Sequence, residues 1–196
     1  MSRDRGIVVA SDECYAEFTY DDDGRPTTPV TALGSGADGV LAVHSLSKRS
    51  NMAGLRAGFV AGDSELVAYL AEVRKHSGLM TPAPVQAAAA AALGDDEHVR
   101  EQQLRYARRR AVAVPALEAC GLVHDGGPST FYLWLRTRDG TSDGWAITAQ
   151  VAETGLLLAP GDFYGEAGAA HARMALTVTD DALAMACDRL SEASVT

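Results

Sequence analysis

The sequence predicts an α/β protein: a partial, mostly parallel sheet flanked by helices, followed by a small C-terminal α+β domain. Over residues 1–94, short apolar runs ending in polar residues alternate with helical segments, a pattern typical of strands buried on both faces. After Gly121, further short apolar runs alternate with helical segments. Hydrophobic residues make up 47% of the 196 residues, which is sufficient for a buried core. We therefore expect a partial large domain at 1–94, a long connecting helix at 95–121 and a small domain at 122–196.

The large-domain part should contain three strands and two helices. Strands are expected at 6–10, 40–44 and 56–61, and helices at 64–76 and 85–93. Asp63 is a suitable N-cap for the first helix, and Gly94 ends the second. Residues 21–39 are rich in Asp, Gly, Pro and Thr, so they are expected to form a surface loop.

The rest of the chain should contain the connecting helix and the small domain. The long helix is expected to begin after Asp95 or Asp96 and to end near Cys120, with Pro115 as a kink. Strands are expected at 122–123, 131–135, 156–158 and 172–176, and helices at 143–153 and 180–193.

Composition excludes several classes of function. The net charge of −9 and pI near 4.9 argue against a nucleic-acid partner, because phosphate contacts need clustered Lys and Arg. The longest small apolar run, 87–93, is too short to span a membrane, and no secretory leader is recognisable at the start. Three cysteines and five histidines form no metal-binding spacing, so we expect no metal site. Reduced thiols indicate a cytoplasmic protein.

Two short motifs point to functions that their context contradicts. Residues 34–39 match GxGxxG, but a dinucleotide fingerprint follows a strand, and this one precedes a predicted strand. Residues 45–48 match SxxK, the pattern of serine acylases, but the partner tripeptides SDN and KTG do not occur. That pattern also needs the serine at the start of a helix, whereas Ser45 follows a predicted strand.

A third set of residues carries a more consistent chemistry. Asp12 and Tyr15 follow the first predicted strand, Ser45 and Lys48 follow the second, and Arg56 lies at the third. If the strands are neighbours, these side chains meet at the carboxyl edge of the sheet, where ligands bind in open α/β folds. A lysine amine can form a Schiff base, a carboxylate can hold a protonated pyridine nitrogen, and a hydroxyl with a guanidinium can hold a phosphate. Pyridoxal 5'-phosphate (PLP) needs all of these groups.

The order and spacing of these residues resemble the fold-type-I PLP-dependent aminotransferases of class I/II. Residues 11–15 (SDECY) resemble the family motif S-D-E-x-Y. Residues 45–58 resemble the family signature S-x-S-K-x-x-x-x-x-G-x-R-x-G. Residues 160–165 and 173–176 resemble markers of the C-terminal domain. The resemblance implies the C-terminal part of the PLP-dependent transferase fold, with 1–94 as part of the PLP-binding domain.

The resemblance also implies a role for each matched residue. Lys48 would form the Schiff base with the cofactor and move the proton. Asp12 would pair with the pyridine nitrogen, and Tyr15 would donate to the phenolic oxygen of the ring. Ser45 and Arg56 would bind the phosphate. In the small domain, Arg173 would bind the α-carboxylate of the substrate.

Within the family, residues 9–62, 82–88 and 158–165 most resemble the actinobacterial type of N-succinyldiaminopimelate aminotransferase. This type implies amino transfer between glutamate and N-succinyl-2-amino-6-ketopimelate in lysine and diaminopimelate biosynthesis, in a homodimer acting on small molecules. Fold-type-I β-lyases and decarboxylases share the same lysine and aspartate. A non-catalytic PLP-sensing effector domain is a further alternative, although no basic DNA-binding module is visible.

The resemblance covers the C-terminal half of the family's chain. Relatives supply a phosphate-binding turn, a ring-stacking aromatic and an asparagine from the other half, and none of these motifs is found here. The chain is thus expected to be a truncated form, to bind PLP weakly or not at all by itself, and to have little turnover.

Overall fold

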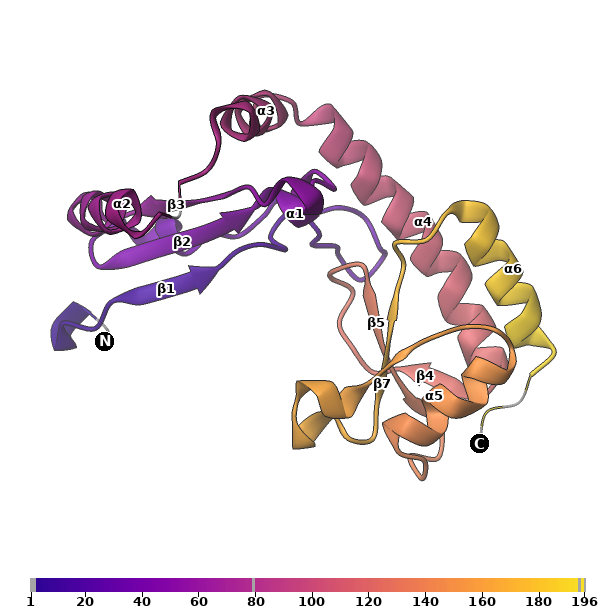
Figure 1. Ribbon diagram of the computed structural model, residues 1–196. Coiled ribbons are helices and arrows are strands. Elements are labelled where there is room, and N and C mark those ends of the chain that lie inside the picture. The colour runs from indigo at the N-terminus through magenta and orange to yellow at the C-terminus, as the bar shows by residue number, and fades with distance from the viewer. Residues whose placement is uncertain (1–2, 79, 194, 196) are drawn as a thin grey trace. The chain divides into compact units, whose positions relative to one another are not determined.

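The computed structural model describes residues 3–78, 80–193 and 195, and the chain divides into two compact units (Figure 1). The first unit comprises the residues up to Thr19 together with Thr27–Gln103. The second comprises Tyr20–Pro26 and the residues from Leu104 onward. The boundary falls inside one long helix, so each unit takes part of that helix into its own packing.

The first unit is built on a mixed three-stranded sheet in the order β1-β2-β3. Strands β1 (Val9–Asp12) and β2 (Val40–Ser45) are parallel neighbours, and β3 (Gly58–Gly62) pairs antiparallel with β2. The carboxyl ends of β1 and β2 therefore lie at the same edge of the sheet. The first residues of β3 lie there too, because Gly58 is aligned with Ser45.

Short helical turns and two longer helices complete the first unit. They are η1 (Arg3–Arg5), η2 (Ala32–Ser35), α1 (Leu46–Arg49), η3 (Ala53–Leu55), α2 (Ser64–Ser77) and α3 (Ala83–Leu93). Asp63 caps α2 by accepting hydrogen bonds from Glu65 and Leu66, and its other oxygen accepts from the N–H of Gly39. Among the described residues, α2 and α3 contain no buried side chain. The small core of this unit instead includes Phe18, Ala42 and Leu46.

Helix α4 (Glu97–Ala119) begins in the first unit and ends in the second. Its buried residues Tyr106, Ala113 and Leu117 follow one another at spacings of seven and four positions, which places them on one face of a helix. In the second unit, Arg109 donates to the carbonyl of Leu176 and pairs with Asp180. The pairing and the burial together attach the helix to the second sheet.

The second unit is an antiparallel sheet in the order β4-β5-β7-β6 with two helices. Its elements are β4 (Leu122–His124), β5 (Tyr132–Thr137), α5 (Gly144–Glu153), β6 (Ala159–Pro160), η4 (Gly161–Tyr164), η5 (Glu166–Gly168), β7 (Ala172–Ala175) and α6 (Asp180–Ser191). The core is made of side chains that alternate along β5 and recur along α5. They include Leu133, Leu135, Ile147 and Val151, and Leu190 of α6 joins them.

The α/β fold class predicted from the sequence is confirmed, with three local corrections. The first strand begins at Val9 rather than at residue 6. Residues 156–158 are not a strand: β6 pairs with β7 only at Ala159 and Pro160, and Leu157 is 88% exposed. Ser45 does start a helix, because it ends β2 and caps α1. The SxxK motif is therefore excluded only by its missing partner motifs.

No helix in the described residues combines the length and the apolar character needed to cross a bilayer.

We expect Gly144→Ala to destabilise the second unit. An added Cβ at Gly144 would lie 2.0 Å from the carbonyl oxygen of His171, in backbone that α5 cannot leave without losing its contact with β7. The free energy of unfolding should fall by roughly 1–3 kcal/mol, as for other overpacked cores. Denaturant titration followed by tryptophan fluorescence measures this, because both tryptophans, Trp134 and Trp145, lie in this unit.

Gly127→Ala is the matched control, since an added Cβ there meets nothing within 4 Å. Equal midpoints for the two variants would contradict the close-packing argument.

Candidate functional site

The candidate residues of the first unit lie at one edge of its sheet. Asp12 is the last residue of β1, and Ser45 is the last residue of the neighbouring parallel strand β2. The N–H of Glu13 donates to the carbonyl of Val43 at 2.9 Å, which continues the ladder past Asp12. Arg56 lies two residues before β3, whose first residue is aligned with Ser45. The parallel pairing thus places these functional groups at one edge.

Asp12 presents an ionised carboxylate at this edge. Its Oδ1 accepts a hydrogen bond from the backbone N–H of Cys14 at 3.1 Å, and the side chain is exposed. Hydrogen bonds from the thiol and the backbone N–H of Cys14 hold the pKa of Asp12 below its usual value. A negative carboxylate here can accept a proton-bearing nitrogen of a ligand. Burial and Asp12 raise the pKa of Cys14 to about 11, so its thiol is not an activated nucleophile.

Lys48 and Tyr15 are brought together by the turns that follow β1 and β2. The Nζ of Lys48 lies 5.6 Å from the centroid of the Tyr15 ring, a cation–π distance. Lys48 belongs to α1, a single turn capped by Ser45, whose side-chain oxygen accepts from the N–H of Ser47 at 3.1 Å. The cap uses Ser45 Oγ as an acceptor, and the hydroxyl proton of Ser45 is left for another acceptor.

Two residues with left-handed backbone conformation follow Lys48. Asn51 and Arg56 both have φ of 53°, an unusual conformation for residues other than glycine. Arg56 is exposed and donates to the carbonyl of Ala53 at 2.9 Å. It lines a groove of about 540 Å³ together with Arg74, whereas Ser45 lines a different cleft of about 230 Å³. The predicted pair of phosphate ligands, Ser45 and Arg56, is thus at one edge but not in one cleft.

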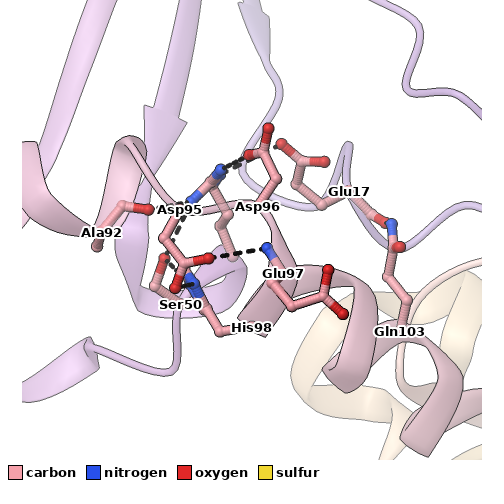
Figure 2. A network of polar contacts seen from close by, with 9 residues as sticks. Glu17, Ser50, Ala92, Asp95, Asp96, Glu97, His98 and Gln103 are labelled. Carbon is pink, nitrogen blue, oxygen red and sulfur yellow. Dashed lines mark hydrogen bonds and ion pairs between the residues drawn. The ribbon is translucent and has the colours of Figure 1, made fainter.

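Arg49, the residue after Lys48, binds Glu17, Ala92 and Asp96, three residues of the polar network labelled in Figure 2. Its Nη1 donates to the carbonyl of Ala92 at 2.8 Å, its Nη2 pairs with Asp96 at 2.5 Å, and its Nε lies 3.4 Å from Glu17. Next to it, His98 contacts Ser50 Oγ at 3.0 Å through Nε2 and Asp95 at 2.9 Å through Nδ1. The network attaches α1 to the end of α3 and the start of α4.

The second unit holds Arg173 between two tyrosine rings. Arg173 lies in β7, and its Cζ is 4.1 Å from the ring centroid of Tyr132 and 4.7 Å from that of Tyr164. Among the described residues, its guanidinium has no hydrogen-bond acceptor and no carboxylate partner. The two rings attract the cation through their π faces but accept no N–H···O hydrogen bond from it, so its N–H groups stay available to an anion. An arginine in this state is suited to bind a carboxylate.

Trp134 packs against the same group of aromatic rings. It contacts Tyr164 edge to face at 5.6 Å, stacks on His171 at 5.2 Å and is aligned with Arg173 in the β5–β7 ladder. Asp125 accepts a hydrogen bond from Nε2 of His171 at 3.2 Å, which restrains the ring that stacks on Trp134.

Sequence reasoning missed Arg49, Tyr132 and Tyr164. A lone arginine beside a lysine is usually a solvated surface residue, so only its buried contacts reveal Arg49. A signal for Tyr132 was present, because it lies two residues before Trp134 and so shares its face of the expected strand. Tyr164 is in a turn, where no periodicity applies.

Comparison with known proteins identifies the family. The family model for aminotransferase class I and II matches residues 1–190. The chain is 49% identical to a probable aminotransferase of Mycobacterium tuberculosis and 47% identical to a 4-dedimethylamino-4-oxo-anhydrotetracycline transaminase of Streptomyces rimosus. Each match covers 97% of this chain, and 45% and 52% of those proteins, respectively.

More distant matches agree. An LL-diaminopimelate aminotransferase of Nitratidesulfovibrio vulgaris is 33% identical over 95% of this chain and 48% of its own length. The crystal structure of an aminotransferase of Neisseria meningitidis superposes with a TM-score of 0.80 and 31% identity, over 97% of this chain and 49% of that one. The chain spans about half of the length of the curated relatives that it matches. On these matches and on the arrangement of Asp12, Tyr15 and Lys48, the chain belongs to the class I and II aminotransferase family.

Proposed function

We propose that this chain carries the lysine-bearing part of a PLP-dependent aminotransferase. The observation that supports this proposal most directly is that Asp12, Tyr15 and Lys48 lie at the carboxyl edge of β1 and β2. The Nζ of Lys48 is 5.6 Å from the centroid of the Tyr15 ring. An acid, a phenol and an amine at one edge match the polar groups of a pyridoxal ring. An α/β sheet binds its ligands at this edge.

The residues present fit the cofactor. Asp12, held anionic by Cys14, would hold the pyridine nitrogen, and Tyr15 would donate to the phenolic oxygen. Ser45 and Arg56 would contribute to phosphate binding. When bound, PLP supplies an electron sink for the carbanion at the substrate Cα.

Lys48 and Arg173 have the two other roles that the reaction requires. The Lys48 amine would hold the cofactor aldehyde before substrate arrives, and it would then carry the proton from Cα. Arg173 would bind the α-carboxylate through its in-plane N–H groups, which orients the Cα–H bond for cleavage. The stacked tyrosines leave its charge uncompensated until the substrate binds.

For the substrates, we propose glutamate as amino donor and N-succinyl-2-amino-6-ketopimelate as acceptor, in lysine and diaminopimelate biosynthesis. The relative named LL-diaminopimelate aminotransferase supports an acceptor of this class. A ketone of a tetracycline-type precursor is the second candidate, because the transaminase of Streptomyces rimosus is 47% identical. Parallel assays with the two acceptors separate them.

We expect PLP to label Lys48 in preference to Lys75 after borohydride reduction. These are the only two lysines of the sequence, and Lys75 is an exposed residue of α2 that serves as an internal reference. Peptide mapping by mass spectrometry measures the ratio of the two pyridoxyl labels. Lys48→Arg should leave only the slow label on Lys75, and Asp12→Asn should lower the label on Lys48.

Equal labelling of the two lysines in the unsubstituted chain would contradict a cofactor role for Lys48. Labelling of Lys48 together with β-elimination from, or decarboxylation of, an amino acid, and without amino transfer to either keto acid, would favour the β-lyase or decarboxylase alternatives.

We expect Arg173→Gln to weaken binding of 2-oxoglutarate about tenfold or more, because a bidentate charged contact is lost. Tyr164→Leu should weaken it roughly threefold to thirtyfold, the range of one cation–π contact, and Tyr164→Phe should have little effect. Calorimetric titration gives these dissociation constants. Arg138→Gln is the matched control, because Arg138 lies outside the aromatic stack and donates to a carbonyl of α4. A similar loss in Arg138→Gln would show that the effect is general charge reduction.

A further inference from the structure

We propose that Arg49 is a positioning residue for Lys48: its contacts hold the one-turn helix α1 and so determine the direction of the lysine side chain. The inference rests on the proposed role of Lys48 and adds a residue whose function would be exerted entirely through its neighbour.

Helix α1 is too short to be stable by itself. It has four residues, whereas isolated helices shorter than about 12 residues are marginal in water. Its backbone is tied at each end, by the Ser45 cap and by the N–H of Ser50, which donates to the carbonyl of Leu46. The buried side chain of Leu46 anchors one face of the turn. The N–H of Leu46 also donates to the carbonyl of Ala57 at 3.1 Å, and side-chain contacts restrain the rest of the turn.

Arg49 supplies such contacts on another face. Its planar guanidinium binds acceptors on three separate segments: Glu17 after β1, Ala92 at the end of α3 and Asp96 before α4 (Figure 2). A planar fork that binds in three directions has little freedom to rotate. Lys48 is the adjacent residue, about 100° away around the helix, so fixing Arg49 fixes the direction in which Lys48 leaves the turn.

The burial of these groups indicates a role in orientation more than in stability. Only 12% of the Arg49 side chain is exposed, but its partner Asp96 is 82% exposed. A carboxylate this exposed is well hydrated without a partner, so removing Arg49 leaves no desolvated charge at Asp96. Ser50, His98 and Asp95 form a second connection from the end of α1 to α4, so the loss of Arg49 should loosen the turn without unfolding it.

The two lysines of the chain provide a test that needs no cofactor. Acylation by an N-hydroxysuccinimide acetate, mapped by mass spectrometry, reports the reactivity of Lys48 relative to Lys75. We expect half-buried Lys48 to react more slowly than Lys75 in the unsubstituted chain. In Arg49→Met, the Lys48/Lys75 ratio should rise roughly tenfold to a hundredfold, the change in a local opening equilibrium on loss of a charge-assisted hydrogen bond. Arg49→Lys should restore the ratio only in part.

Controls separate positioning from general destabilisation. Arg100→Met makes the same substitution in α4 and removes an exposed pair with Glu97, so the ratio should not change. Hydrogen exchange in the β2 peptide reports whether the sheet stays folded. If Arg49→Met also increases hydrogen exchange in β2, the Asp96→Asn variant tests the proposal in its place. Asp96→Asn removes one contact of Arg49 at an exposed site. It should raise the Lys48/Lys75 ratio in the same direction. An unchanged ratio in both variants, or an equal rise in Arg100→Met, would overturn the proposal.

A spectroscopic measurement connects the result with the cofactor. PLP held on Lys48 in one orientation gives a visible circular dichroism band. We expect that band, per pyridoxyl label on Lys48, to fall several-fold in Arg49→Met and to be retained in Arg100→Met. An unchanged band in Arg49→Met would overturn the positioning of the cofactor by Arg49. If PLP shows no preference for Lys48 in the unsubstituted chain, the proposed function fails, whereas the acylation ratio still decides the role of Arg49.

Discussion

The parallel pairing of β1 with β2 is the constraint on which the candidate site of the first unit depends. Two parallel neighbours must end at the same edge, so Asp12 and Ser45 are placed together by backbone hydrogen bonds alone. Tyr15 and Lys48 lie on the turns that leave those two strands, which brings a phenol and an amine to the same edge. A shift of the ladder by one residue would reverse the face of each strand side chain and disperse the set.

Helix α4 contributes to the surroundings of both key cations, each within its own unit. In the first unit, Asp96 and His98 at its start bind Arg49 and Ser50, on either side of the end of α1. In the second, Arg110 donates to the carbonyls of Thr130 and Tyr132, at the start of the strand whose tyrosine stacks on Arg173. The same helix and the residue before it thus support the lysine turn through Asp96 and His98, and the helix supports the arginine strand through the guanidinium of Arg110.

The sequence was sufficient for the elements whose signal is local. Apolar runs and capping residues predicted β2 and α2 closely, and motif spacing placed Lys48 directly after β2. The sequence was insufficient where the formation of a strand depends on a partner strand. The apolar residues 156–158 looked like a strand, but they pair with no strand in the described part of the chain, and Leu157 remains exposed. The burial of Arg49 was also unpredictable, because its acceptors lie 32 residues before it and 43 and 47 residues after it in the chain.

The arginines of this fold differ in how their charge is compensated, and this difference bears on function. Arg49 and Arg109 are each bound to a carboxylate and a backbone carbonyl, so their charge is used within the protein. Arg173 is held by two aromatic faces, which attract the cation but accept no N–H···O hydrogen bond in its plane. A guanidinium oriented in this way keeps both its direction and its capacity for an anion. For the role proposed for Arg173, this arrangement has an advantage over an ion pair, because a carboxylate of the protein would compete with the carboxylate of a substrate.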